Sequence, residues 1–180
     1  MPLSAGTNSN SAPPAPSPTA SGGQNGSRMN TEAKRVIEEQ RLAYVATVSP
    51  DGTANVSPKG TIAVWDNDHL VFADIRSPGT VANISRNPSV ELNVVDPFLR
   101  KGYRFKGTAQ IVRNGELYTK IVDFYRGRGS KRAAAAQAFV LVKVERVKPL
   151  ISPAYDDGAD EKSVRGRWIS YYDSLHRQQR

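Results

Sequence analysis

Cysteine is absent from the 180 residues of this chain. Its absence excludes a disulfide scaffold, a thiolate metal site and a cysteine nucleophile. Histidine is almost as scarce, since His69 on an expected hairpin strand and His176 in the C-terminal tail are the only two. We interpret both as incidental, so the sequence predicts no metal site.

Long hydrophobic runs are missing as well. No apolar run approaches the roughly 18 residues that cross a bilayer as a helix. The N-terminus also lacks the Lys/Arg segment followed by an apolar stretch that marks a secretory signal. The sequence therefore predicts no membrane partner and a cytoplasmic location.

Acidic residues are outnumbered by basic ones. There are 17 Asp and Glu against 25 Lys and Arg, which gives a formal net charge of +8. A basic chain favours anions, and the candidates are nucleic acid, an anionic membrane surface or a phosphorylated small molecule. The charge alone does not choose among them, and an ordinary basic surface explains the total equally well.

The composition divides the chain into three parts. Residues 1–28 are mainly Ser, Pro, Ala, Gly and Asn, with Arg28 as their only charge. Such a segment has too little apolar surface to offset the entropy of ordering, so a disordered tail is predicted. The remaining length suits one domain. We expect a folded domain at 29–152 and a partly helical C-terminal extension at 153–180.

Short strands joined by short turns dominate the expected secondary structure. Strands do not alternate with helices, which argues against a parallel α/β sheet and for an antiparallel barrel with helices at its ends. Thr31 is the expected cap of the first helix. The expected helices are 31–41, 77–86 and 116–125; the expected strands are 42–49, from 54, 61–65, 69–73, 90–95, 103–112 and 138–147; and 126–132 is expected to be a basic loop.

The segment Ser77-Pro78-Gly79-Thr80 has the composition of a helix start. Serine is a favoured N-cap, proline suits the first helical position, and glycine allows close approach to the backbone. A helix N-terminus presents free N–H groups and partial positive charge, which suit a phosphate. Arg76 immediately precedes it. The alternative is a plain helix cap beside a surface arginine.

The run Ser57-Pro58-Lys59-Gly60 interrupts an expected strand. Proline and glycine within a strand indicate a bulge or a sheet edge. That geometry can direct Lys59 towards a ligand near the helix start after Ala73. The alternative is a solvated lysine in a turn.

Residues 100–107 hold four cations and two aromatic rings in eight positions. On a strand, Tyr103 and Phe105 share one face while Arg104 and Lys106 share the other. Cations beside aromatic rings bind nucleic-acid bases or flavin rings. The alternative is an amphipathic strand with a basic outer face.

From Tyr44 to about Val112, the chain resembles the pyridoxamine 5'-phosphate oxidase-like, FMN-binding split-barrel family. The resemblance depends on the order and spacing of several pieces together. These pieces are Val48-Ser49-Pro50-Asp51-Gly52, Ser57-Pro58-Lys59-Gly60, the segment around Ser77, Asn87-Pro88-Ser89-Val90, and Gly102-Tyr103-Arg104-Phe105-Lys106-Gly107-Thr108-Ala109.

The resemblance implies a mainly β fold, a six-stranded antiparallel split β-barrel with short peripheral helices. It also implies a homodimer with FMN at the subunit interface, and a deazaflavin is the alternative cofactor. Lys101 and Arg104 fall where the partner subunit tends to contribute to the ring end of the cofactor. The implied cofactor-binding residues are Ser57, Lys59, Asp74, Arg76, Ser77, Thr80, Lys101 and Arg104.

The chain also departs from the vitamin-forming oxidases of this family. Aligned without gaps, those enzymes have Arg and Lys where this chain has Pro58 and Ala63, and their Ser-Arg-Lys phosphate triplet falls on residues 78–80. Those enzymes also have a substrate-binding pattern of Trp and Arg near the C-terminus, and Arg167-Trp168 matches it only weakly. The chain is more similar to the general-stress and uncharacterised branch, so we do not expect it to form pyridoxal phosphate.

These observations predict an FMN-binding flavoprotein, an oxidoreductase with an unknown small-molecule substrate. The alternatives are a deazaflavin-dependent reductase on the same fold, or a non-enzymatic flavin- or anion-binding protein. Nucleic acid is the disfavoured partner. No acid–base pair stands out, so no catalytic residue is predicted.

Overall fold

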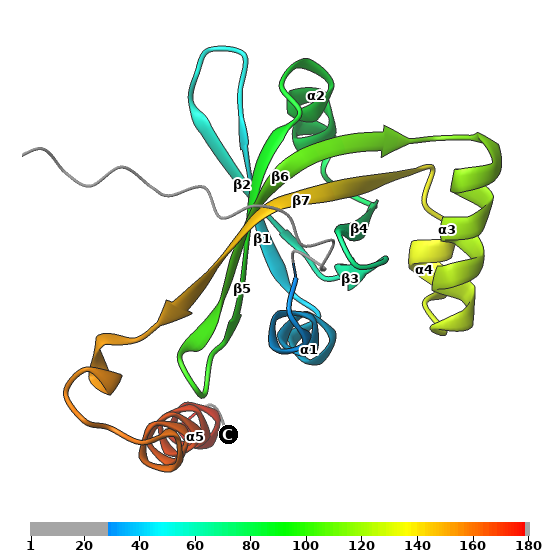
Figure 1. The fold of residues 1–180 in the computed structure, drawn as a ribbon. Coiled ribbons are helices and arrows are strands. Elements are labelled where there is room, and N and C mark those ends of the chain that lie inside the picture. Colours follow the sequence, from blue (N-terminus) through cyan, green and yellow to red (C-terminus); the bar gives the residue numbers. More distant parts are fainter. Residues whose placement is uncertain (1–28, 179–180) are drawn as a thin grey trace, which may run out of the picture.

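One antiparallel sheet of seven strands forms the centre of residues 29–178, the part of the chain that the computed structural model describes. The predicted disordered tail, 1–28, lies outside these residues. The strands follow the order β2-β1-β5-β6-β7-β4-β3, and the sheet is strongly twisted and curled (Figure 1). The strands are β1 (Ala43–Val48), β2 (Ala54–Lys59), β3 (Ala63–Val64), β4 (His69–Asp74), β5 (Ser89–Asp96), β6 (Lys101–Val112) and β7 (Ala138–Ile151).

Short helices surround this sheet, as the sequence predicts. They are α1 (Thr31–Gln40), α2 (Pro78–Arg86), α3 (Gly115–Gly127), α4 (Lys131–Ala134), the 3-10 helix η1 (Pro153–Tyr155) and α5 (Glu161–Gln178). The mainly β split-barrel architecture is thus confirmed, but the strand count of six is wrong. The described residues form seven strands, the same number as the local sequence patterns indicate, and the count of six came from the family resemblance. The expected strand at 61–65 is reduced to the two residues Ala63–Val64, which pair with β4.

Three local predictions need correction. Asn30 caps α1 in place of Thr31: its side chain accepts a hydrogen bond from the Ala33 amide at 2.8 Å. The expected loop at 126–132 is mostly helical, because α3 continues to Gly127 and α4 begins at Lys131. The last strand runs on to Ile151, since it pairs with β6 along the whole length of that strand.

The sheet buries apolar side chains in two clusters on opposite faces. The first lies inside the curl, where α1 and α2 pack against the strands, and it contains Phe72, Leu92 and Phe105. The second lies between β4 and β7 on one side and α3 and α4 on the other, around Tyr125 and Phe139. These two clusters fix the curl of the sheet and hold the ends of β2 and β4 near α2.

The opposite side of β1 and β2 presents apolar side chains to solvent. Tyr44 is 53% exposed, Val48 41% and Val56 61%. Alternation along the strands explains this face, since the intervening Ala43, Val45 and Thr47 point into the core. The outer face of β1 and β2 is therefore apolar, and its side chains are exposed to solvent in the described chain.

Helix α5 attaches to the tip of the β5–β6 hairpin (Figure 1). The Arg100 guanidinium lies 3.4 Å from the centre of the Trp168 ring, and Phe98 meets Tyr172 edge to face. Among the described helices, none is long and apolar enough to cross a membrane.

Candidate functional site

The end of β2 and the junction between β4 and α2 enclose a cavity of about 330 Å³. Both segments were selected from the sequence as separate pieces, and the curl of the sheet brings them together. The cavity is lined by Ser57, Pro58, Lys59, Gly60, Thr61, Ala73, Ile75, Arg76 and Ser77.

Lys59 is the most unusual residue of this cavity, because only 4% of its surface is exposed. Its ammonium lies 2.7 Å from Ser57 Oγ, 3.5 Å from Thr80 Oγ1 and 5.7 Å from the centre of the Phe72 ring. These partners are hydroxyls and a ring, which stabilise a buried charge less than a bound carboxylate does.

The pKa of Lys59 reflects this environment. Burial lowers it below the ordinary value of 10.5, while the negative charge of Asp74 acts in the opposite direction. A buried cation of this kind gains more from an anionic ligand than a solvated lysine does, because its own hydration is already lost. The cavity is therefore suited to an anion.

Ser77, the residue directly before α2, lines the cavity next to the first turn of the helix. Pro78 occupies the start of the helix, as expected, but the predicted side-chain cap by Ser77 is wrong. Ser77 Oγ instead donates to Asp74 Oδ1 at 2.9 Å, and the Ser77 amide lies 3.3 Å from the same oxygen. Asp74 thus orients the turn, and in the described chain no side chain caps the first-turn amides of α2.

Arg76 lines both this cavity and a wider depression of about 750 Å³, as do Ile75 and Ser77. The depression also receives Lys131 and Arg132 from α4. The sequence marks both as part of a basic stretch, but the stretch is distant in the chain and nothing local shows where it packs. The structure therefore adds two cations near the predicted phosphate segment.

Thr61 and Tyr125 hold the loop that follows Lys59. The Tyr125 hydroxyl donates to the Thr61 carbonyl at 2.6 Å, and Thr61 Oγ1 accepts from the Ala73 amide at 2.9 Å. Burial raises the pKa of Tyr125, so this hydroxyl stays protonated and keeps donating. Sequence reasoning missed both residues, because a threonine in a turn and a tyrosine on a helix carry no local signal for this contact.

Lys101 and Arg104 lie elsewhere in the subunit. Asp74, beside the cavity, pairs with Ala138 at the start of β7, whereas Lys101 pairs with Ile151 at its end. Asp74 and Lys101 are therefore opposite the two ends of the same strand. That strand is about 40 Å long at 3.3 Å per residue. Within one chain, Lys101 and Arg104 do not join the cavity around Lys59, and their contact with a cofactor bound to a partner subunit stays a prediction.

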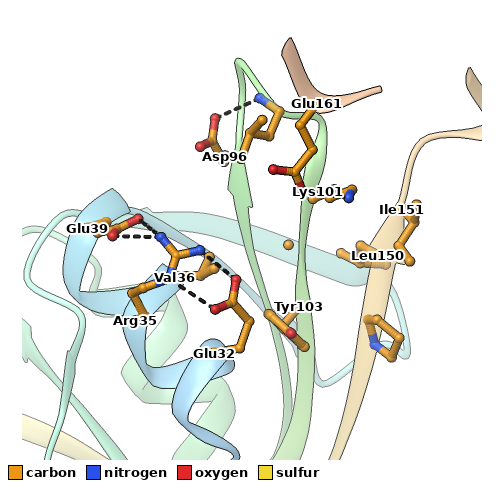
Figure 2. A pocket seen from close by; sticks show the side chains of 13 residues that line it. Glu32, Arg35, Val36, Glu39, Asp96, Lys101, Tyr103, Leu150, Ile151 and Glu161 are labelled. Atoms are coloured by element: carbon orange, nitrogen blue, oxygen red, sulfur yellow. Dashed lines mark hydrogen bonds and ion pairs between the residues drawn. The ribbon is translucent and has the colours of Figure 1, made fainter. Parts of the chain in front are cut away.

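Lys101 instead borders a second cavity, of about 270 Å³, beside α1 (Figure 2). Its ammonium lies 2.8 Å from Glu161 Oε1, and Figure 2 shows Arg35 held between Glu32 and Glu39. The two carboxylates raise the pKa of Arg35. Glu32, Glu39, Asp96 and Glu161 outnumber Arg35 and Lys101 around this cavity, so its charge does not suit a phosphate.

The chain is similar to known proteins in both sequence and fold. The family model described as pyridoxamine 5'-phosphate oxidase matches residues 29–150. An uncharacterised protein of Methanocaldococcus jannaschii is 34% identical over 87 residues, which is 47% of this chain. The chain spans 57% of the length of that curated relative.

Solved structures share the fold over about two thirds of this chain. HupZ of Group A Streptococcus is 33% identical, with a TM-score of 0.62 over 69% of this chain and 95% of HupZ. An F420 reductase is 26% identical, with a TM-score of 0.51 over 67% of this chain and 98% of the reductase. Residues 29–150, which the family model matches, contain both cavity-forming segments, at the ends of β2 and β4.

Proposed function

Because the chain belongs to the pyridoxamine 5'-phosphate oxidase family, we propose that it is a flavoprotein that binds FMN through the cavity around Lys59. The observation that carries this proposal is the buried Lys59 ammonium, whose near neighbours are the hydroxyls of Ser57 and Thr80. A phosphate there would supply the negative charge that the buried cation lacks at hydrogen-bond distance.

Each wall of the cavity has a role in this proposal. Lys59 donates to the phosphate from the strand side, the first-turn amides of α2 donate from the helix side, and Arg76 closes the solvent side. Asp74 holds Ser77 and so fixes the position of those amides. The exposed Arg76 side chain can reorient to form a bidentate contact with a phosphate.

The proposed activity is oxidation–reduction of an unknown small molecule. A bound flavin supplies the electron transfer, and the chain binds, orients and shields it. We assign no catalytic residue. The departures at Pro58, Ala63 and 78–79 still favour a reaction other than pyridoxal phosphate formation.

We further propose a homodimer that uses the bare apolar face of β1 and β2. Tyr44, Val48 and Val56 are each more than 40% exposed on that face, and a contiguous exposed apolar patch is typical of an interaction surface. The family resemblance supports a cofactor at the subunit interface. Sedimentation at several protein concentrations measures the oligomeric state, and a monomer throughout would contradict this part of the proposal.

A deazaflavin is the second candidate cofactor. The F420 reductase that shares the fold supports it, and a deazaflavin with a phosphate would use the same cations. Only the ring and the groups beyond the phosphate differ, so the cavity around Lys59 does not separate the two candidates. A direct comparison of affinities is required.

Purification under mild conditions, followed by titration with FMN and a deazaflavin, tests the function. We expect the protein to retain or take up FMN, seen as quenching of flavin fluorescence, and to bind FMN more tightly than the deazaflavin. Tighter deazaflavin binding would favour the second candidate. Failure to bind either one would contradict the proposed flavoprotein.

Replacing Arg76 with alanine tests the placement of the phosphate. We expect FMN affinity to fall by about 10-fold or more, because a charge-assisted contact to phosphate is worth about 1.5–3 kcal/mol. Arg126 is the matched control: its exposed guanidinium pairs with Asp123 on α3, and Arg126→Ala should change affinity by less than about 1 kcal/mol. Equal losses in the two variants, measured by fluorescence titration, would argue against the site.

A further inference from the structure

The outer faces of β6 and β7 carry four cations side by side. Arg104 and Lys106 lie on β6, and Lys148 and Arg146 lie directly opposite them on β7. We refer to Arg104, Lys106, Arg146 and Lys148 as the cationic quartet. All four are exposed. The phosphate cavity does not use Lys106, Arg146 or Lys148.

A β-bulge produces this arrangement. The pairing of β6 with β7 shifts between Lys106 and Gly107, so that Lys106 faces Arg146 while Gly107 faces Val144. Glu145 is the extra residue, and both it and Arg146 are exposed. Without the bulge, strict alternation would turn Arg146 inward together with Val144. The bulge is therefore what places the Arg146 side chain on the outer face of the sheet.

The quartet forms two pairs of like charge across β6 and β7. Arg104 faces Lys148, and Lys106 faces Arg146. Such pairs are destabilising, because opposed side chains start from Cβ atoms only about 5 Å apart. Along each strand the cations are two residues apart, which is roughly 7 Å. The quartet thus concentrates four positive charges in a small area of a rigid sheet.

The quartet borders a shallow depression of about 40 Å³. Glu91 is the one carboxylate that lines it, and its Oε1 pairs with Arg104 Nε at 3.0 Å. Glu145, the neighbour of Arg146 in the chain, accepts a hydrogen bond from the Thr108 hydroxyl at 2.6 Å. The lining therefore has four positive charges against one negative charge, and it leaves space for a small charged group.

We propose that the cationic quartet is a binding site for a compact oligoanion with three or more negative charges, such as an oligophosphate. Closely spaced anionic groups would relieve both like-charge pairs at once, and arginine binds phosphate in a bidentate manner. A single charge would neutralise only part of the quartet. None of the four residues lines the cavity around Lys59 at the ends of β2 and β4. Arg104 is the one member that is also a predicted contact to a flavin bound on a partner subunit, so the test variant is made at Arg146.

Thermal unfolding in sodium tripolyphosphate tests this proposal, with the full chain and no added flavin. We expect millimolar tripolyphosphate to raise the melting temperature of the wild type by several degrees. Orthophosphate at equal ionic strength should have a much smaller effect. Equal stabilisation by both salts would indicate a general salt effect and overturn the proposal.

Arg146→Glu is the decisive variant, because it places a carboxylate opposite Lys106. We expect the melting temperature without tripolyphosphate to stay equal or rise, and the response to tripolyphosphate to fall at least fivefold. Lys162→Glu changes the charge by the same amount on exposed α5 and should keep the wild-type response. A full response in Arg146→Glu would overturn the proposal.

Two further measurements distinguish an oligoanion from other partners that could bind the cationic quartet. A single-stranded oligonucleotide that binds more tightly than tripolyphosphate would reassign the surface to nucleic acid and overturn a compact ligand. A change in oligomeric state in Arg146→Glu, seen by sedimentation, would assign the quartet to the subunit interface and overturn it as well. FMN titration of the same variant should match the wild type, so failure of the flavin proposal is recognised independently.

Discussion

Replacing Lys59 with methionine is expected to weaken FMN binding by about 10- to 100-fold and to raise the melting temperature of the ligand-free protein. The first effect follows from losing a charged contact to phosphate, worth about 1.5–3 kcal/mol. The second follows from burial, which lowers the pKa of Lys59 and so shows that the folded state disfavours its charge.

The sign of the stability effect can be derived from linkage. A lysine whose pKa is lower in the folded state than in the unfolded state holds its proton less tightly when folded. The resulting destabilisation is full below the folded-state pKa and is lost as the pH rises from that pKa to the ordinary value of 10.5. Methionine keeps the apolar stem beside Phe72 and removes the charge.

The opposite signs of the two effects make the Lys59 experiment informative. Fluorescence titration gives the affinity, and thermal unfolding without flavin gives the stability. Lys120→Met on the exposed face of α3 is the control and should leave FMN affinity unchanged. If Lys59→Met lowered stability and left affinity intact, Lys59 would be a structural residue and the proposed phosphate site would be wrong.

Replacing Phe72 with alanine is expected to lower the free energy of unfolding by about 3–5 kcal/mol, the usual cost of truncating a buried phenylalanine. Phe72 is completely buried in the larger core, on the strand that leads into the cavity. For a folded unit of this size the melting temperature should fall by roughly 6–20 °C. Urea unfolding measures the change directly.

A matched phenylalanine provides the control for this change. Phe98 is half-buried at the tip of the β5–β6 hairpin, where it meets Tyr172 of α5. We expect Phe98→Ala to cost less than half as much, because its neighbours can relax into solvent. Equal costs for the two variants would mean that the hairpin and α5 contribute as much stability as the main core.

Local sequence patterns determined most of the secondary structure. The strands expected at 69–73, 103–112 and 138–147 all form, and Pro78 after Ser77 marked the start of α2. The apolar neighbours Val36 and Ile37 lie on the buried side of α1. These features depend on neighbours in the chain, so they can be read without knowledge of the fold.

The errors have a common physical origin. Ser77 has the composition of a cap, yet its hydroxyl binds Asp74, because the turn before α2 brings that carboxylate within 2.9 Å. The last strand was predicted too short because its final residues are held by β6 rather than by their own β-propensity. In both cases a contact with another part of the structure, Asp74 for Ser77 and β6 for the last strand, decided the local conformation.

The sequence by itself determined that Lys59, Arg76 and the start of α2 are basic or amide-rich segments that can hold a phosphate. Only the tertiary structure decided that Lys59 is buried and that Lys131 approaches the same region. It also paired Lys101 of β6 with the C-terminal end of β7 and turned Arg146 outward through a bulge. The physical reason is that pairing between distant strands sets the register and curl of the sheet. Register depends on the complementary surfaces of both strands, and neither strand specifies it alone.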